Sequence, residues 1–322
     1  MSNAEPSPHD SLVWLLTLSK TLLSTRELDR LLELVVKTFV EATEAERGFL
    51  LLMNKEGELV NVHGATRSGE ILESEEPRVS SLAAQVASDG IPIFSTDTEH
   101  DTRMDARASI VELGLRMIVC VPLTGPSGIV GVIYADGKTT LSKVFTLTNQ
   151  RSLEALADHA AAAIENARLF EDATRDAESG LFHAQYFSSQ LTELARGGDA
   201  WLALLDLDDL EGVAARLGPA AAKQVFLSVA RSLRAQLQRP EIGGRLTESI
   251  FGICLRGREA EVRQRLADIQ KRNAKARVGD LDIDVRVSIG GVRISGRVED
   301  ARRRAEAALT QARSEPQSLF IA

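Results

Sequence analysis

The sequence of 322 residues has few of the features that mark several large classes of protein. It holds only two cysteines, Cys120 and Cys254, each within an apolar, strand-like run, so we expect buried thiols and no disulfide. No stretch approaches the roughly 18 consecutive apolar residues that a membrane-spanning helix needs. No charged-then-apolar signal peptide opens the chain, so we expect a cytoplasmic protein without a membrane span.

The chain also lacks an excess of positive charge and has few aromatic residues. The formal net charge of −8 argues against nucleic-acid binding through phosphate neutralisation and against docking on an anionic membrane. Aromatic residues make up 4%, which weakens the case for a flat, stacked ligand. The 44% of hydrophobic and 26% of charged residues are typical of a globular protein, and the length suffices for about two domains.

Apolar periodicity divides the chain into two α/β halves of the α+β kind. Residues 1–10 are polar, contain proline and resemble an expression tag, so we expect them to be disordered or tag-derived. Over 11–173 the predicted order is α-β-β-α-β-β-β-α, a central antiparallel sheet with helices packed on it. Over 174–322 helices and strands alternate, which favours a mixed sheet covered by helices.

A long helix expected over 146–173 joins the halves. Its apolar positions alternate in steps of three and four, which is typical of a heptad seam: Leu153, Leu156, Ala160, Ala163, Ala167 and Phe170. The alanines would let two helices approach closely, so the seam predicts a homodimer, parallel or antiparallel. The alternative is that the same stripe packs on the sheet of its own domain.

The first half carries the strings "IVCVPLTGPSGIVGVIYADG" and "IENARLF", on which residues 11–173 resemble the GAF domain family. The resemblance implies a sensory module with a six-stranded antiparallel sheet, often dimeric, and a ligand pocket between sheet and short helices. We place that pocket around Leu82, Val86, Phe94 and Met104. The signature of the cyclic-nucleotide-binding members is absent, and we expect no cofactor.

A polar segment near this pocket brings possible metal ligands together. Asp97, Glu99, His100 and Asp101 form a mixture of carboxylate and imidazole groups that metal sites use. The interpretation we favour is a polar surface loop without metal.

The second half carries "RDAESGLFHAQYF", "LLDLDDLEGVAARLGPAAAKQVF", "VSIGGV" and "AEAALTQAR", on which residues 174–322 resemble the GGDEF (diguanylate cyclase) family. Such a cyclase joins two GTP molecules across a dimer. Its chemistry requires carboxylates that hold two divalent cations on the triphosphate. It also requires a glycine turn where the backbone approaches the phosphates without obstruction.

The signature of that family is degenerate in this chain. The pattern R-Y-G-G-D/E-E-F becomes Arg245-Leu246-Thr247-Glu248-Ser249-Ile250-Phe251. Thr247 and Glu248 replace both glycines, Ser249 replaces the metal-binding acid, and Ile250 replaces the second acid. A carboxylate at Glu248 stands one position early, and a slip of one residue in a strand reverses the face.

Other positions of the nucleotide site have changed as well. The resemblance places Asp206 at the first metal-binding aspartate, with Asp208 following it, and Arg313 at a phosphate-contacting lysine. The guanine-recognising asparagine has become Ala214, and its partner aspartate has become Lys223. The aspartates from Asp206 to Asp209 have two interpretations: a strand end that caps the next helix, or a vestigial metal site.

We therefore expect a homodimeric signal-transduction protein with a GAF input module and a catalytically inactive GGDEF-like module that serves regulation or protein interaction. No catalytic residue and no metal ligand are expected. Vestigial nucleotide-site positions are Asp206, Glu248, Ser249 and Arg313. The alternatives are an active diguanylate cyclase and a receptor that binds GTP or cyclic di-GMP without turnover. The sequence names neither the GAF ligand nor the protein partner.

Overall fold

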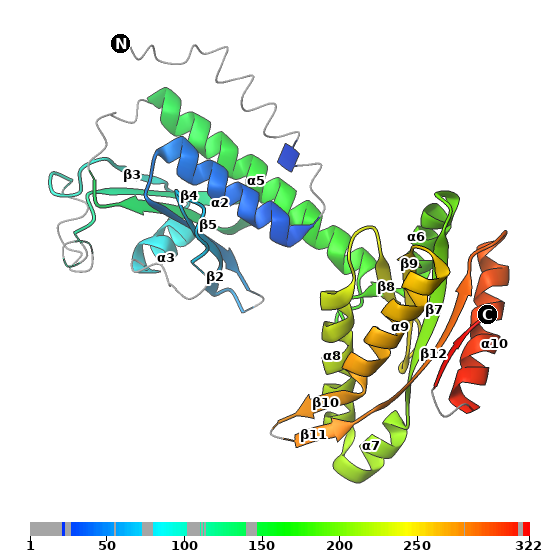
Figure 1. The fold of residues 1–322 in the computed structure, drawn as a ribbon. Coiled ribbons are helices and arrows are strands. Elements are labelled where there is room, and N and C mark those ends of the chain that lie inside the picture. Colours follow the sequence, from blue (N-terminus) through cyan, green and yellow to red (C-terminus); the bar gives the residue numbers. More distant parts are fainter. Residues whose placement is uncertain are drawn as a thin grey trace. The chain divides into compact units, whose positions relative to one another are not determined.

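The computed structural model divides the chain into two compact units, Met1–Glu171 and Asp172–Ala322 (Figure 1). The described residues are 21–22, 27–54, 56–72, 80–101, 110, 112, 114–139, 147–279, 281–314 and 318–322. Met104, assigned to the expected pocket, lies outside them. Among the described helices, none offers an apolar stretch of the length that a bilayer core demands.

The first unit is built on an antiparallel sheet, as the sequence predicted. Its described strands follow the order β2-β1-β5-β4-β3: β1 (Arg47–Met53), β2 (Leu59–Thr66), β3 (Ile93–Ser95), β4 (Met117–Gly125) and β5 (Gly128–Gly137). Beyond β2, the chain turns back and Leu72 N–H donates to Gly64 O over 2.8 Å. Five described strands thus stand where the resemblance implied six, and the returning segment extends the β2 edge.

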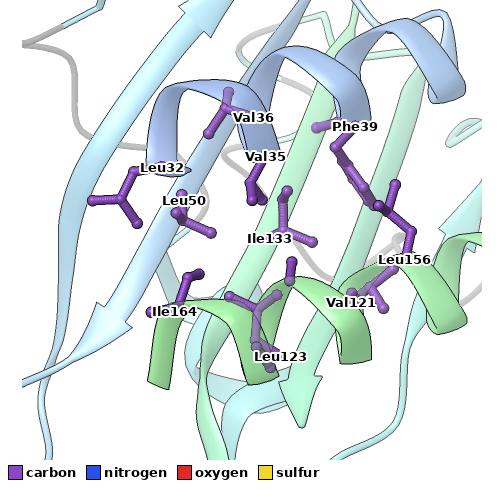
Figure 2. Packing of buried hydrophobic residues seen from close by; sticks show 14 of the residues in the cluster. Leu32, Val35, Val36, Phe39, Leu50, Val121, Leu123, Ile133, Leu156 and Ile164 are labelled. Atoms are coloured by element: carbon purple, nitrogen blue, oxygen red, sulfur yellow. The ribbon is translucent and has the colours of Figure 1, made fainter. Parts of the chain in front are cut away.

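Helices cover both faces of this sheet. The helices α2 (Leu28–Thr43) and α5 (Leu147–Thr174) lie together on one face, and the shorter α3 (Ser80–Asp89) lies on the other (Figure 1). The core under α2 and α5 joins Phe39, Ile133 and Leu156, all buried (Figure 2). Hydrophobic burial between these helices and the sheet is therefore the main stabilising contribution of this unit.

The heptad stripe of α5 is used inside this core. Five of its members are buried against α2 and the sheet: Leu153, Leu156, Ala160, Ala163 and Ala167. Phe170 is half-buried, and Leu169 beside it is 66% exposed. Packing on the domain's own sheet, the alternative interpretation, is thus what the structure shows for Leu153 to Ala167. Those five side chains are not available to a second copy.

The second unit contains a six-stranded mixed sheet of order β13-β12-β7-β9-β8-β6. Its strands are β6 (Phe182–His183), β7 (Ala200–Asp208), β8 (Ile242–Arg245), β9 (Ile250–Arg256), β12 (Arg286–Arg293) and β13 (Leu319–Ile321). A separate hairpin joins β10 (Lys275–Val278) to β11 (Leu281–Asp284). The helices are α6 (Ala184–Arg196), α7 (Leu210–Leu217), α8 (Pro219–Gln236), α9 (Glu259–Asn273) and α10 (Val298–Ser314). The predicted mixed sheet with helices is confirmed.

Two element boundaries differ from the sequence prediction. The apolar pattern predicts a helix over Leu181–Arg196, but the helix begins at Ala184. Phe182 and His183 pair in parallel with β8, and the His183 side chain accepts a hydrogen bond from Tyr186 N–H as the N-cap. The run "LDIDVRVSIGGVRI" predicts one strand region over 281–294, but the region is broken at Val285. Its first part pairs with β10, whereas β12 pairs with β7.

Close packing of α10 on β12 depends on a glycine. A Cβ at Gly290 would lie 2.1 Å from the backbone nitrogen of Leu309, which cannot move without displacing the helix. A Cβ at the neighbouring Gly291 would project to the opposite face, where its nearest atom is the end of the flexible Leu266 side chain at 3.1 Å.

We predict that Gly290→Ala lowers the free energy of unfolding by about 3 kcal/mol, because the added methyl group overpacks the helix–sheet contact. Gly291→Ala, the matched control, should change it by less than about 1 kcal/mol. Urea denaturation followed by Trp201 fluorescence, in a Trp14→Phe background, measures both. Equal effects of the two variants would contradict the assignment of the contact.

Candidate functional site

The degenerate signature forms the turn of a hairpin between β8 and β9. Arg245 and Phe251 pair across the strands, and Leu246 N–H donates to Ile250 O over 2.9 Å. The Thr247 hydroxyl accepts hydrogen bonds from the backbone N–H groups of Ile250 at 3.1 Å and Ser249 at 3.3 Å. A side chain thus closes the turn, and Glu248 remains exposed. The stretch "GGRLTESIF" predicts a strand-turn-strand hairpin, and that hairpin is confirmed, with no glycine in its turn.

Asp206, near the end of the central strand β7, meets this hairpin and α10. The residue is 6% exposed, and the Ser249 hydroxyl donates to its Oδ1 over 2.7 Å. Arg313 donates to its Oδ2 from Nε at 3.0 Å and from Nη2 at 2.6 Å. The structure therefore brings together three of the four predicted vestigial positions. A guanidinium of the same chain thus binds this carboxylate.

Asp208 and Asp209 are also engaged by neighbouring side chains. Ser288 donates to Asp208 Oδ2 over 2.6 Å, and Arg286 forms an ion pair with the same oxygen at 3.2 Å. Burial raises the pKa of Asp208, while the Ser288 hydrogen bond opposes that shift. Asp209 occupies the N-cap position of α7, yet its side chain makes no capping bond and pairs instead with Arg216. The capping interpretation thus gives the position of Asp209 but not a side-chain capping bond.

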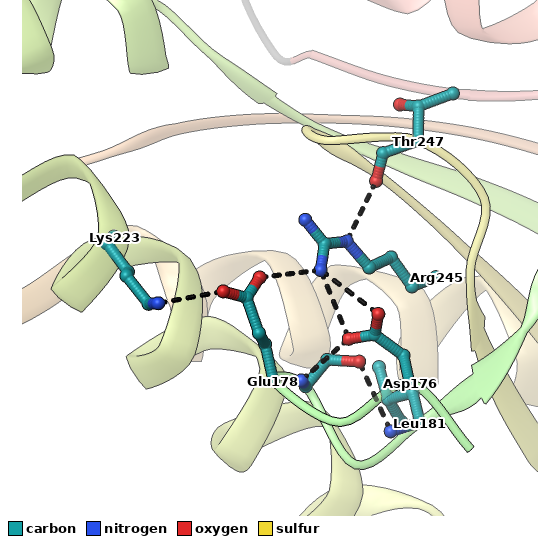
Figure 3. Close-up of polar contacts among 7 residues, drawn as sticks. Asp176, Glu178, Leu181, Lys223, Arg245 and Thr247 are labelled. Atoms are coloured by element: carbon teal, nitrogen blue, oxygen red, sulfur yellow. Dashed lines mark hydrogen bonds and ion pairs between the residues drawn. The ribbon is translucent and has the colours of Figure 1, made fainter. Parts of the chain in front are cut away.

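A second charge cluster surrounds Arg245 (Figure 3). Its Nη1 donates to both carboxylate oxygens of Asp176, at 3.2 and 3.1 Å, and to Glu178 Oε2 at 2.8 Å. The guanidinium carbon lies 4.4 Å from the ring centroid of Phe226, which stacks on Phe251 at 5.0 Å. Arg245 is thus held by two carboxylates and an aromatic face.

Glu178 extends this cluster to α8. Its Oε1 lies 2.7 Å from Lys223 Nζ, so one carboxylate bridges two cations. The hydrogen bonds from Lys223 and then Arg245 lower the pKa of Glu178. For Asp176, burial acts to raise the pKa, but hydrogen bonds from Ser179 and Arg245 outweigh it and lower the pKa. Sequence reasoning missed Glu178, because nothing in its spacing shows which helix the turn approaches.

The expected GAF pocket residues do not all come together. Leu82 and Val86 are fully buried in the cluster under α3. Phe94 is half-buried and packs against the other cluster, under α2 and α5. Alternation along β3 explains the separation, because Ile93 points to the α3 side and its neighbour must point to the opposite face.

The acidic segment is a loop of ion pairs. Arg116 pairs with Asp97 at 3.3 Å and with Glu99, and His100 Nδ1 lies 2.8 Å from Asp97 Oδ2. Within the described ranges, no group of three or more His, Cys, Asp or Glu residues is placed to hold a metal ion. Asp97, Glu99 and His100 thus make ion pairs within a polar loop.

Comparisons with known proteins cover both units. Residues 25–165 match the family model "GAF domain", and residues 173–318 match "Diguanylate cyclase, GGDEF domain". No curated protein matches the chain. Diguanylate cyclase SiaD from Pseudomonas aeruginosa, solved with its activator SiaC, is 25% identical; the match covers 49% of this chain and 65% of SiaD, with a TM-score of 0.45.

Two further solved structures are similar to this chain over about the same share of its length as SiaD. The coiled coil and GGDEF domain of DgcB from Caulobacter crescentus, in complex with c-di-GMP, is 21% identical, with 48% of this chain and 88% of that chain covered and a TM-score of 0.44. The FimX GGDEF domain from Pseudomonas aeruginosa is 19% identical, with 46% and 99% covered and a TM-score of 0.42. The present chain spans slightly less than two thirds of the SiaD chain.

The Asp206–Arg313 pair yields a prediction about stability. Arg313→Met leaves a buried carboxylate with only the Ser249 hydroxyl, which should cost about 1–2 kcal/mol of unfolding free energy. Asp206→Asn in the Arg313→Met background should recover most of that loss, because the uncompensated charge is gone. Urea denaturation of wild type, both single variants and the double variant closes the cycle. A double variant as unstable as Arg313→Met would refute the pairing.

Proposed function

We propose, on the premise that this chain carries a GAF domain followed by a GGDEF domain, that it regulates cyclic di-GMP signalling without making cyclic di-GMP. The combination of these two domains points to cyclic di-GMP signalling. The GAF domain serves as the input module, and the GGDEF-like domain responds by changing its contacts with a protein partner. The alternative, an active diguanylate cyclase, requires a site that holds divalent cations on GTP.

The arrangement around Asp206 is the observation that carries this proposal. Metal-assisted phosphoryl transfer needs acidic oxygens that are free to coordinate cations. Here Asp206 already accepts hydrogen bonds from Arg313 and Ser249, and the signature acids are replaced by Ser249 and Ile250. A divalent cation at Asp206 would lie next to a guanidinium that repels it. The negative charge of Asp206 is thus neutralised by Arg313 of the same chain.

The positions expected to recognise guanine support the same conclusion. Guanine presents N–H donors on its base edge, which an acceptor pair must receive. Lys223 offers only donors, and the Ala214 side chain offers no polar group. Lys223 is moreover engaged with Glu178. Neither residue can supply the acceptors.

The reaction itself provides the test. Purified protein incubated with GTP and Mg²⁺ should form no cyclic di-GMP above an enzyme-free blank, in an assay in which a competent diguanylate cyclase gives product. Cyclic di-GMP formed by the wild type and abolished in Asp206→Asn would overturn the proposal. Calorimetric titration with GTP, cyclic di-GMP and ATP separates the remaining alternative, a receptor, which would bind GTP or cyclic di-GMP in preference to ATP and release heat without turnover.

A homodimer through α5 is part of the proposed function, and it must use a face other than the buried stripe. Leu169 is 66% exposed on the last turns of the helix, after the described core residues end. An exposed leucine on a helix is available for an apolar contact with a second copy of that helix. The dimer would then form at the end of α5 that leads into the GGDEF-like domain.

We expect Leu169→Glu to lower dimer affinity by at least about tenfold, since it would place two like charges in an apolar contact. Ile91→Glu is the matched control, because Ile91 is 67% exposed outside α5 and should leave the affinity unchanged. Sedimentation-velocity runs over a concentration series measure both. A monomeric wild type, or equal effects of the two variants, would count against this interface.

A further inference from the structure

Glu178 lies between two cations that come from different parts of the second unit. It belongs to the turn that follows α5, whereas Lys223 lies on α8 and Arg245 on β8. One carboxylate oxygen is 2.7 Å from Lys223 Nζ and the other is 2.8 Å from Arg245 Nη1 (Figure 3). The carboxylate therefore bridges two cationic side chains.

Arg245 is held in place independently of Glu178. Asp176 accepts hydrogen bonds from the same guanidinium nitrogen, and the guanidinium carbon lies over the Phe226 ring. Arg245 is 21% exposed, so it presents a fixed donor at the surface rather than a swinging side chain. Lys223 lies on the other side of the Glu178 carboxylate. Together the two cations offer the hydrogen-bond donors that bind oxyanions such as phosphate.

We propose that Lys223 and Arg245 form a binding site for the phosphate groups of a polyanionic ligand, and that Glu178 occupies this site as a resident anion. The inference deepens the proposed function and rests on it in one respect: because Lys223 replaces the acceptor that guanine needs, the ligand is recognised by charge and not by its base. Binding of the ligand displaces Glu178 from both cations.

The exposure of the bridge makes displacement feasible. Glu178 is 42% exposed and Lys223 is 59% exposed. Ion pairs that accessible to water are weak and are screened by salt. A polyphosphate brings several negative charges to Lys223 and Arg245, whereas Glu178 brings one. The release of Glu178 removes one of the two ion pairs between this turn and Arg245 of the hairpin, and the pair with Asp176 remains.

The test is a calorimetric titration of the full chain with tripolyphosphate at low ionic strength and without Mg²⁺. Glu178→Gln keeps the shape of the side chain and removes its charge, so its affinity should rise about tenfold over the wild type. GTP and ATP should bind Glu178→Gln with equal affinity. Thermal unfolding monitored by circular dichroism verifies that each variant is folded.

Two variants serve as controls. Glu193→Gln removes the same charge from α6, where Glu193 pairs with Arg196, and should leave the affinity at the wild-type value. Glu178→Gln combined with Lys223→Gln should lose the gain. Equal affinities of Glu178→Gln and wild type, an equal gain in Glu193→Gln, a gain retained in the double variant, or a preference for GTP over ATP would each overturn the inference. None of these results depends on whether cyclic di-GMP is formed.

Discussion

The carboxylate of Asp206 is the group on which the second unit's site depends. It lies near the end of the central strand, shielded from water, and an isolated buried charge there would be strongly unfavourable. Arg313 reaches it from α10 and Ser249 reaches it from the β8–β9 turn, so its neutralisation joins three separate elements. The same contacts that satisfy the charge occupy the oxygens a metal would need. The contacts of Arg313 and Ser249 with Asp206 therefore account both for the stability of this buried charge and for the proposed loss of catalysis.

The other charges of this unit follow the same pattern. Asp208 is satisfied by Ser288 and Arg286, and Arg245 is satisfied by Asp176 and Glu178. Lys223, Arg245 and Arg313 each have a carboxylate of the chain as a partner. These partners differ in accessibility: the Asp206 carboxylate is buried, whereas Glu178 is in contact with water. Exchange with an external anion is consequently easier at Glu178.

In the first unit, hydrophobic packing imposes the corresponding constraint. The sheet has two faces, and α5 with its alanine-rich stripe covers one of them next to α2. Alanine permits a helix to lie close to a sheet as well as close to another helix, so the stripe's composition suits both uses. Beyond the buried stripe, Leu169 is an exposed leucine of α5.

Much of the fold was determined by the sequence alone, because hydrophobic periodicity and turn residues act over a few neighbouring positions. The strand order along the chain, the β8–β9 hairpin and the missing acids at Ser249 and Ile250 could all be predicted in this way. Only the tertiary structure decided that Arg313 lies on Asp206, that Glu178 bridges Lys223 and Arg245, and that Phe94 faces away from Leu82. Those contacts join residues far apart in the sequence, and they depend on how helices and strands pack in three dimensions, which no local pattern encodes.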